Sequence, residues 1–161
     1  MAIGCFFFLY TSCTIPFKNY YYTLEGNIRP KKPKFSLAKY PYQLKRTDVI
    51  DTNSVYIREE KTRRIDNTVY IHYSFYRFFS NGKALRGSSF DIFPSLDNFN
   101  SVKGSSMNYY KIENNKLIIE YFVNSPHSNG YYGFHTSQII NDSIQYYKRI
   151  KVEGLKGTPD W

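Results

Sequence analysis

Residues 68–90 read TVYIHYSFYRFFSNGKALRGSSF and carry the clearest fold signal in the chain. Apolar side chains recur on one face of an extended chain at Val69, Ile71, Tyr73, Phe75 and Phe79. His72 and Ser74 lie on the other face, and this period of two predicts a β-strand. Asn81-Gly82 supplies the residues of a tight turn, whose two central positions need positive φ. The stretch therefore predicts an antiparallel hairpin in which residues 83–90 pair back.

The same pattern recurs on both sides of this hairpin. Val55 and Ile57 alternate with Tyr56 and Arg58, which predicts an earlier strand. Two further hairpins are expected downstream, with residues 107–112 and 117–123 around Asn114-Asn115, and residues 131–140 and 143–152 around Asn141-Asp142. Residues 91–106 contain Pro, Asn, Ser and Gly instead, and predict a long loop or one short helical turn.

Composition and connectivity set the fold class. The chain has 161 residues, of which 19% are aromatic, with 17 Tyr and 13 Phe, and such residues suit a pleated, half-buried surface. About seven strands follow one another with no room for the long crossovers of parallel pairing. We therefore predict an all-β protein, an antiparallel meander that curls into a small closed or partly open barrel to hide its edges.

The N-terminus carries a processing signal. Residues 2–10 are uncharged and mostly apolar, too short to span a bilayer, and Thr11-Ser12-Cys13 follows them. This ending resembles the lipobox of bacterial lipoprotein signal peptides, although Tyr10 stands where that family prefers an aliphatic residue and no Lys or Arg precedes the apolar stretch. The resemblance implies that residues 1–12 are a removed signal peptide and that Cys13 is lipidated. It implies a cell-envelope protein whose partner is a membrane, bound through the N-terminal lipid.

Charge is concentrated just after this signal. Residues 18–46 hold eight Lys or Arg against the single acid Glu25, whereas residues 47–161 have fourteen bases and twelve acids. Prolines recur among the basic residues, so residues 13–46 are interpreted as the lipidated Cys followed by a basic tether, and residues 47–161 as the β domain. Because the excess charge lies outside the β domain, no nucleic-acid partner is expected.

Four polar residues interrupt the apolar strands and are candidate ligand-binding positions. Glu120 lies within LIIEYFV, Lys148 breaks an apolar face, and His72 and His135 fall in mid-strand. In a barrel with a cavity, such groups among aromatic residues would orient a bound molecule. No metal-ligand spacing and no nucleophile or phosphate-loop motif occurs in the chain, so no metal, cofactor or catalytic residue is predicted.

The short turns, aromatic strands and N-terminal signal together resemble small lipocalin-like lipoproteins of Gram-negative envelopes. The first functional hypothesis is a non-enzymatic envelope lipoprotein, a structural or binding module whose partner is an envelope component or a small apolar ligand. One alternative is an envelope enzyme acting on a glycan or lipid through Glu120 and a histidine. Another is a basic nucleic-acid-binding protein whose residues 29–46 contact phosphates.

Overall fold

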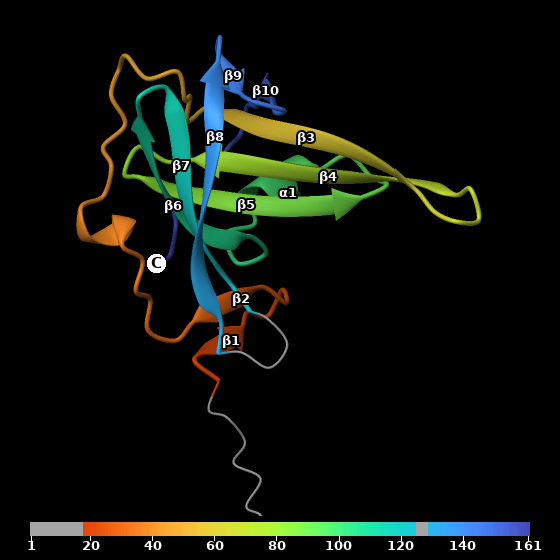
Figure 1. Ribbon diagram of the computed structural model, residues 1–161, viewed down its shortest axis with the longest axis horizontal. Helices are drawn as coiled ribbons and strands as arrows, with labels where there is room; N and C mark the ends of the chain where they lie inside the picture. The colour runs from red at the N-terminus through yellow and green to blue at the C-terminus, as the bar shows by residue number, and fades with distance from the viewer. Residues whose placement is uncertain (1–17, 125–128) are drawn as a thin grey trace, which may run out of the picture.

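The computed structural model describes residues 18–124 and 129–161, and these form an almost wholly β protein (Figure 1). Eight strands make one antiparallel sheet in the order β10-β3-β4-β5-β6-β7-β8-β9, and contacts between β9 and β10 bring its two ends together. The strands are β3 (Ser54–Arg63), β4 (Val69–Phe78), β5 (Lys83–Phe90), β6 (Ser106–Glu113), β7 (Lys116–Val123), β8 (Tyr131–Ile140), β9 (Ser143–Ile144) and β10 (Lys148–Lys151). The predicted all-β, barrel-like antiparallel meander is confirmed.

The predicted turns join these strands where the sequence indicated. Asn114 and Asn115 both have positive φ, at 50° and 59°, between β6 and β7, and Asn141 does so after β8. At the β4–β5 turn Gly82 alone has positive φ, so the expectation for Asn81 is wrong. A Cβ on Gly82 would also lie 2.7 Å from the Tyr42 backbone, which makes glycine the residue that fits this turn.

The last predicted strand, residues 143–152, is two strands in the structure. β9 pairs with β8, whereas β10 pairs with β3 at the opposite end of the sheet. Between them the chain turns at Tyr146, whose φ is 69°, and the Tyr147 N–H donates to the Ile144 carbonyl at 2.8 Å. This break brings the two ends of the sheet close to each other. No Gly or Pro marks this turn in the sequence. The alternating pattern continues across it, and a single strand was therefore predicted.

Both faces of the sheet are buried over much of its area. Strands β3–β5 run across β6–β8 in Figure 1, and their inner faces enclose a cluster that includes Tyr56, Tyr76, Phe78, Tyr110 and Ile119. The outer face of the β3–β5 half is covered by α1 (Leu96–Asn100), whose Phe99 ring meets that of Phe75 at 5.0 Å. β4 is therefore buried on both sides from Tyr73 to Phe78, where the sequence predicted a single apolar face. The short helix falls inside the predicted loop over residues 91–106.

The basic segment folds onto the outer face of β6–β8, where the sequence predicted a tether. It contains the hairpin of β1 (Tyr20–Tyr22) and β2 (Ile28–Pro30) and the 3₁₀ turn η1 (Leu37–Lys39). Phe35 is 3% exposed and its ring lies 5.0 Å from that of Tyr109 and 4.8 Å from that of Tyr132. Burial of this aromatic residue offsets part of the entropy cost of ordering the segment. The lysine side chains of the segment are exposed to solvent, while the segment itself packs against the sheet.

Candidate functional site

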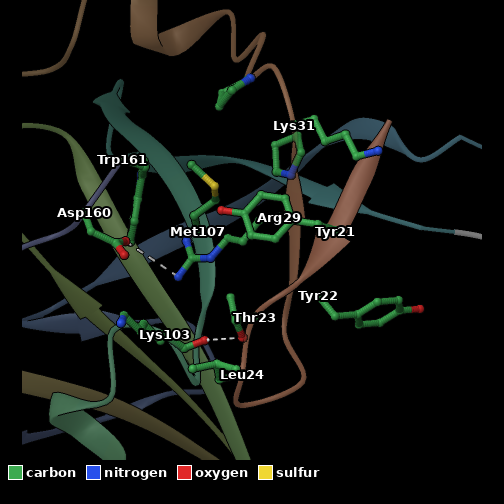
Figure 2. A pocket seen from close by; sticks show the side chains of 12 residues that line it. Tyr21, Tyr22, Thr23, Leu24, Arg29, Lys31, Lys103, Met107, Asp160 and Trp161 are labelled. Carbon is green, nitrogen blue, oxygen red and sulfur yellow. Dashed lines mark hydrogen bonds and ion pairs between the residues drawn. The ribbon is translucent and has the colours of Figure 1, made fainter. Parts of the chain in front are cut away.

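A pocket of about 440 Å³ lies where the β1–β2 hairpin, the loop before β6 and the C-terminal segment meet (Figure 2). Tyr21 and Tyr22 come from β1, Met107 from β6, and Trp161 from the C-terminal segment. The hairpin is held to the loop by Thr23, whose hydroxyl donates to the Lys103 carbonyl at 3.0 Å. The walls are thus aromatic and apolar, and they join parts of the chain far apart in sequence.

Arg29 is the central polar group of this pocket. Its side chain is 5% exposed, and Nη2 donates to the Val102 carbonyl at 2.6 Å. The nearest carboxylate oxygen, on the half-exposed Asp160, is 3.9 Å away. Nη1 is buried and has no hydrogen-bond partner among the described residues. Burial lowers the pKa of Arg29, while the charge of Asp160 acts to raise it. A buried cation that is only partly paired is costly, and an anion beside it would offset that cost.

Trp161 forms the wall next to Arg29, as Figure 2 shows. The Arg29 guanidinium carbon lies 4.7 Å from the Trp161 ring centroid, within cation–π distance. Lys83 donates to the Trp161 carbonyl oxygen, which fixes the backbone of the residue. The indole Nε1 is buried and, like Arg29 Nη1, finds no acceptor in the described part of the chain. Two residues that line the same pocket therefore each carry an unsatisfied donor.

The rim of the pocket is basic. Lys31 and Lys103 are exposed at its edge, and Tyr22 is 55% exposed. An aromatic wall, a buried guanidinium and rim lysines together suit a molecule with an apolar body and an anionic end. Binding of such a molecule needs only these side chains and no metal ion.

The structure gives Glu120 a different role from the predicted one. Glu120 is 2% exposed and lies on the outer face of β7, where its two carboxylate oxygens accept from the backbone N–H groups of Ser36 and Leu37, each at 2.8 Å. These groups are at the start of η1, so the carboxylate holds the N-terminal segment against the sheet. Both oxygens are occupied, and Glu120 does not line the pocket described above.

The two histidines lie on the inner face of the sheet, opposite Glu120. In the β7–β8 register Ile119 faces His135 while Glu120 faces Phe134, so His135 and Glu120 point to opposite sides. His72 shares the inner face with Tyr76 on β4. The predicted acid–base pair of Glu120 with a histidine is therefore wrong, because the alternation of side chains along the strands separates them.

The remaining predicted ligand positions are dispersed. His72 stacks on Phe90 with ring centroids 4.7 Å apart and lies 3.5 Å from a Glu60 oxygen. His135 contacts the Ser137 hydroxyl at 2.9 Å, and burial followed by the charges of Arg86 and Arg58 lowers its pKa. Lys148 is exposed on β10. None of them lines the pocket of Arg29 and Trp161. Cys13 lies outside the described residues.

Sequence reasoning missed Arg29 and Trp161. Arg29 was counted among the charges of a tether, and Trp161, although it is the chain's one tryptophan, belongs to a polar C-terminal stretch. The sequence offered only a weak signal. Aromatic residues occur in the N-terminal segment and in the C-terminal segment, and neither segment has a periodic pattern that would explain them. Only their packing against each other reveals a site.

The described residues contain neither a candidate metal site nor a candidate membrane-spanning helix. Residues 18–124 and 129–161 hold no group of three or more His, Cys, Asp or Glu placed to bind a metal ion. In the same ranges, no helix has the length and hydropathy needed to cross a bilayer.

The comparisons with known proteins gave no relatives. No protein-family model, no curated protein and no solved structure matches the chain.

Proposed function

We propose that this protein is a non-enzymatic binding module of the bacterial cell envelope that holds a small molecule with an apolar body and an anionic end. The observation that carries the proposal is the buried guanidinium of Arg29, with its unpartnered Nη1, in an aromatic pocket. A carboxylate or phosphate would take the place of the distant Asp160 and pair with the guanidinium. Its apolar body would lie against Trp161, Met107 and Tyr21.

The envelope location rests on the resemblance of residues 2–13 to a lipoprotein signal, and the fold is compatible with it. Lys18 lies two residues before β1, whose Tyr21 and Tyr22 line the pocket, so the chain enters the domain beside the pocket. Lys31, Lys32 and Lys34 are exposed at the same end. Each basic residue near an anionic leaflet contributes on the order of 1 kcal/mol, so an N-terminal lipid and these lysines would act together to hold the pocket near the headgroups.

The anchor is tested by intact-protein mass spectrometry after expression in bacteria. The wild-type chain is expected to lose residues 1–12 and to gain the mass of acyl chains on Cys13. In the Cys13→Ser variant neither the cleavage nor the added acyl mass is expected. A wild-type chain that keeps residues 1–12 and carries no lipid would contradict the membrane-anchored half of the proposal and leave the ligand pocket as a separate question.

Ligand binding is tested through Trp161, because the one tryptophan of the chain lines the pocket. Titration with 4-phenylbutyrate is expected to change its fluorescence, whereas the neutral amide of the same compound is expected to bind at least about tenfold more weakly, because it forms no ion pair with the guanidinium. Calorimetry provides an independent measure of both affinities.

Arg29→Gln is expected to abolish the preference for the carboxylate, while Arg63→Gln, on the exposed end of β3, is its matched control. Circular dichroism establishes that both variants are folded. Equal affinity for the acid and the amide in the wild-type protein would overturn the assignment of an anionic ligand. So would a preference that survives in a folded Arg29→Gln.

A further inference from the structure

Strand β8 has an open edge along most of its length. It pairs with β7 from Tyr131 to Gln138, but with β9 only at Ile139 and Ile140. No other strand of the described chain pairs with residues 131–138. In Figure 1 β8 runs from β9 past β4 and β5 toward β1 and β2, with β7 beside it.

The hydrogen bonds of β8 identify which backbone groups face outward. The Ile139 N–H donates to the Asn115 carbonyl beside β7, and the Gln138 carbonyl accepts from Gln145 on the opposite side. Backbone groups alternate in direction along a strand, so those of Tyr132, Phe134 and Thr136 point to the open edge. These three residues have no backbone partner in the described structure. The edge therefore offers a row of N–H and C=O groups for another strand.

This edge lacks the features that normally prevent strand addition. Residues 131–140 read YYGFHTSQII and contain no Lys, Arg, Asp, Glu or Pro. Residues 58–63 form the open edge of β3 beyond β10 and read REEKTR, in which five of six residues are charged. Charged residues on an edge oppose pairing with a further strand, and a neutral edge of this length permits it. The contrast between the two edges indicates that β8 is left accessible.

The charges near β8 determine which strand would fit. Arg58 and Arg86 both act electrostatically on His135, in the middle of the edge. Arg58 pairs with Glu60, whereas Arg86 is 5.9 Å from the Tyr76 ring and no carboxylate of the described residues lies within ion-pair distance of it. Lys34 lies near the N-terminal end of β8, where its backbone N–H donates to the Tyr132 hydroxyl at 2.9 Å. The surroundings are positive, so acidic side chains would be attracted and a second copy of this basic chain would be repelled.

We propose that the open edge of β8 binds an extended acidic segment of another protein, which adds to the sheet as a further strand. Backbone hydrogen bonds to Tyr132, Phe134 and Thr136 would supply affinity. Acidic side chains near Arg86 would supply selectivity. This interaction surface is separate from the pocket of Arg29 and does not depend on it.

Amide hydrogen exchange measured by NMR on the full chain tests the proposal. In the free protein the N–H groups of Tyr132, Phe134 and Thr136 are expected to exchange quickly, while those of Gly133 and His135 are protected by β7. Addition of acetyl-Thr-Glu-Val-Glu-Val-Glu-Thr-amide is expected to slow exchange at the first three positions. The peptide with Lys in place of Glu is expected to bind at least about tenfold more weakly.

Two substitutions at Thr136 distinguish an effect on strand binding at the β8 edge from an effect on the stability of the fold. Thr136→Pro removes one outward N–H without removing a bond to β7, and is expected to weaken peptide binding about tenfold. Thr136→Val keeps the N–H and is the matched control. If the proline variant does not fold, Phe134→Pro provides the same test at the next outward position.

Three results would overturn the proposal. The edge would already be covered if the three N–H groups exchange slowly in the free protein. Equal binding of the Glu and Lys peptides would remove the acidic selectivity. A dimer in analytical ultracentrifugation that Thr136→Pro converts to a monomer would identify a second copy as the occupant.

Discussion

Two buried charged side chains, Glu120 and Arg29, differ in how completely they are hydrogen-bonded. Glu120 accepts two backbone N–H groups at 2.8 Å and so behaves as a structural group. Arg29 donates to one carbonyl and leaves Nη1 without a partner among the described residues. Buried polar groups are normally satisfied, so the unpartnered Nη1 is an exception that calls for an explanation, and a bound anion is the one that we propose. Glu120, which the sequence analysis selected as a ligand position, has a structural role. Arg29, which it overlooked, lines the pocket.

Removing the charge of Glu120 is expected to destabilise the fold. Glu120→Gln keeps the shape but replaces one accepting oxygen with an amide N–H that faces a donor, at a cost of about 1–3 kcal/mol in the free energy of unfolding. Urea denaturation measures this loss. Glu113→Gln, at an exposed position with a surface ion pair to Lys111, is the control and is expected to change stability little. Equal stability of Glu120→Gln and the wild-type protein would contradict the structural role.

Asp160 is expected to compete with the ligand for Arg29. Its oxygen lies 3.9 Å from Nη2 and the side chain is 52% exposed, so it is a weak internal counter-ion. Asp160→Asn is therefore expected to strengthen binding of 4-phenylbutyrate by about three- to tenfold, as measured by Trp161 fluorescence. Asp97→Asn, on α1, is the control. Weaker binding in Asp160→Asn would place the carboxylate within the ligand site instead.

At the scale of the elements, the N-terminal segment is part of the folded unit. η1 and the β1–β2 hairpin cover the outer faces of β6 and β7, and the segment contributes Arg29 and the aromatic residues of one pocket wall. Proline and lysine content predicted a tether because proline-rich and charged segments favour an extended backbone in water. One buried phenylalanine, one buried arginine and the carboxylate of Glu120 are among the groups that hold the segment in place.

Truncation of Phe35 tests whether the segment and the sheet unfold together. Phe35→Ala is expected to lower the free energy of unfolding by about 3–5 kcal/mol, the usual range for a buried phenylalanine. Tyr40→Ala removes an aromatic ring that is 89% exposed in the same segment, and little change is expected. Both are measured by urea denaturation followed by circular dichroism. A Phe35→Ala variant as stable as Tyr40→Ala would mean that the segment acts as a tether after all.

At the scale of the whole molecule, titratable groups make the fold less stable in acid. Burial, Arg86 and Arg58 lower the pKa of His135 from its ordinary 6.5, so the unfolded chain binds that proton first as the pH falls. For Asp51, burial acts to raise the pKa, but hydrogen bonds from Asn53 and Ser54 and the charges of Arg149 and Lys151 lower it overall. Its stabilising contribution is present above the unfolded pKa of about 3.8 and is lost as the pH falls through the lower folded value.

Stability is therefore expected to fall in two stages. The first begins as the pH drops below about 6.5, and His135→Asn is expected to flatten it because the asparagine does not titrate. The second begins below about pH 4, where Asp51→Asn is expected to flatten the curve in the same way. Thermal denaturation at a series of pH values measures both. An unchanged slope between pH 7 and pH 5 in His135→Asn would exclude that residue as the source of the first stage.

Local sequence patterns predicted the strands from β3 to β8 and most of the turns between them, although β1 and β2 were missed and β9 and β10 were predicted as one strand. Alternating aromatic residues fix which stretches are extended, and Gly82, Asn114 and Asn141 accept the positive φ that the turns require. These are local properties, set by each residue and its neighbours. For residues 91–106 they left open a long loop or one short helical turn, and the structure has the helix α1 there.

The near-closure of the sheet, the packing of the N-terminal segment and the pocket depend on contacts between distant parts of the chain. The turn at Tyr146 has no local signal, because pairing of β10 with β3 at the other end of the sheet selects its backbone conformation. Arg29 and Trp161 are separated by most of the chain and meet only after the sheet has formed. Contacts between residues distant in sequence depend on the complete fold, and no local pattern encodes them.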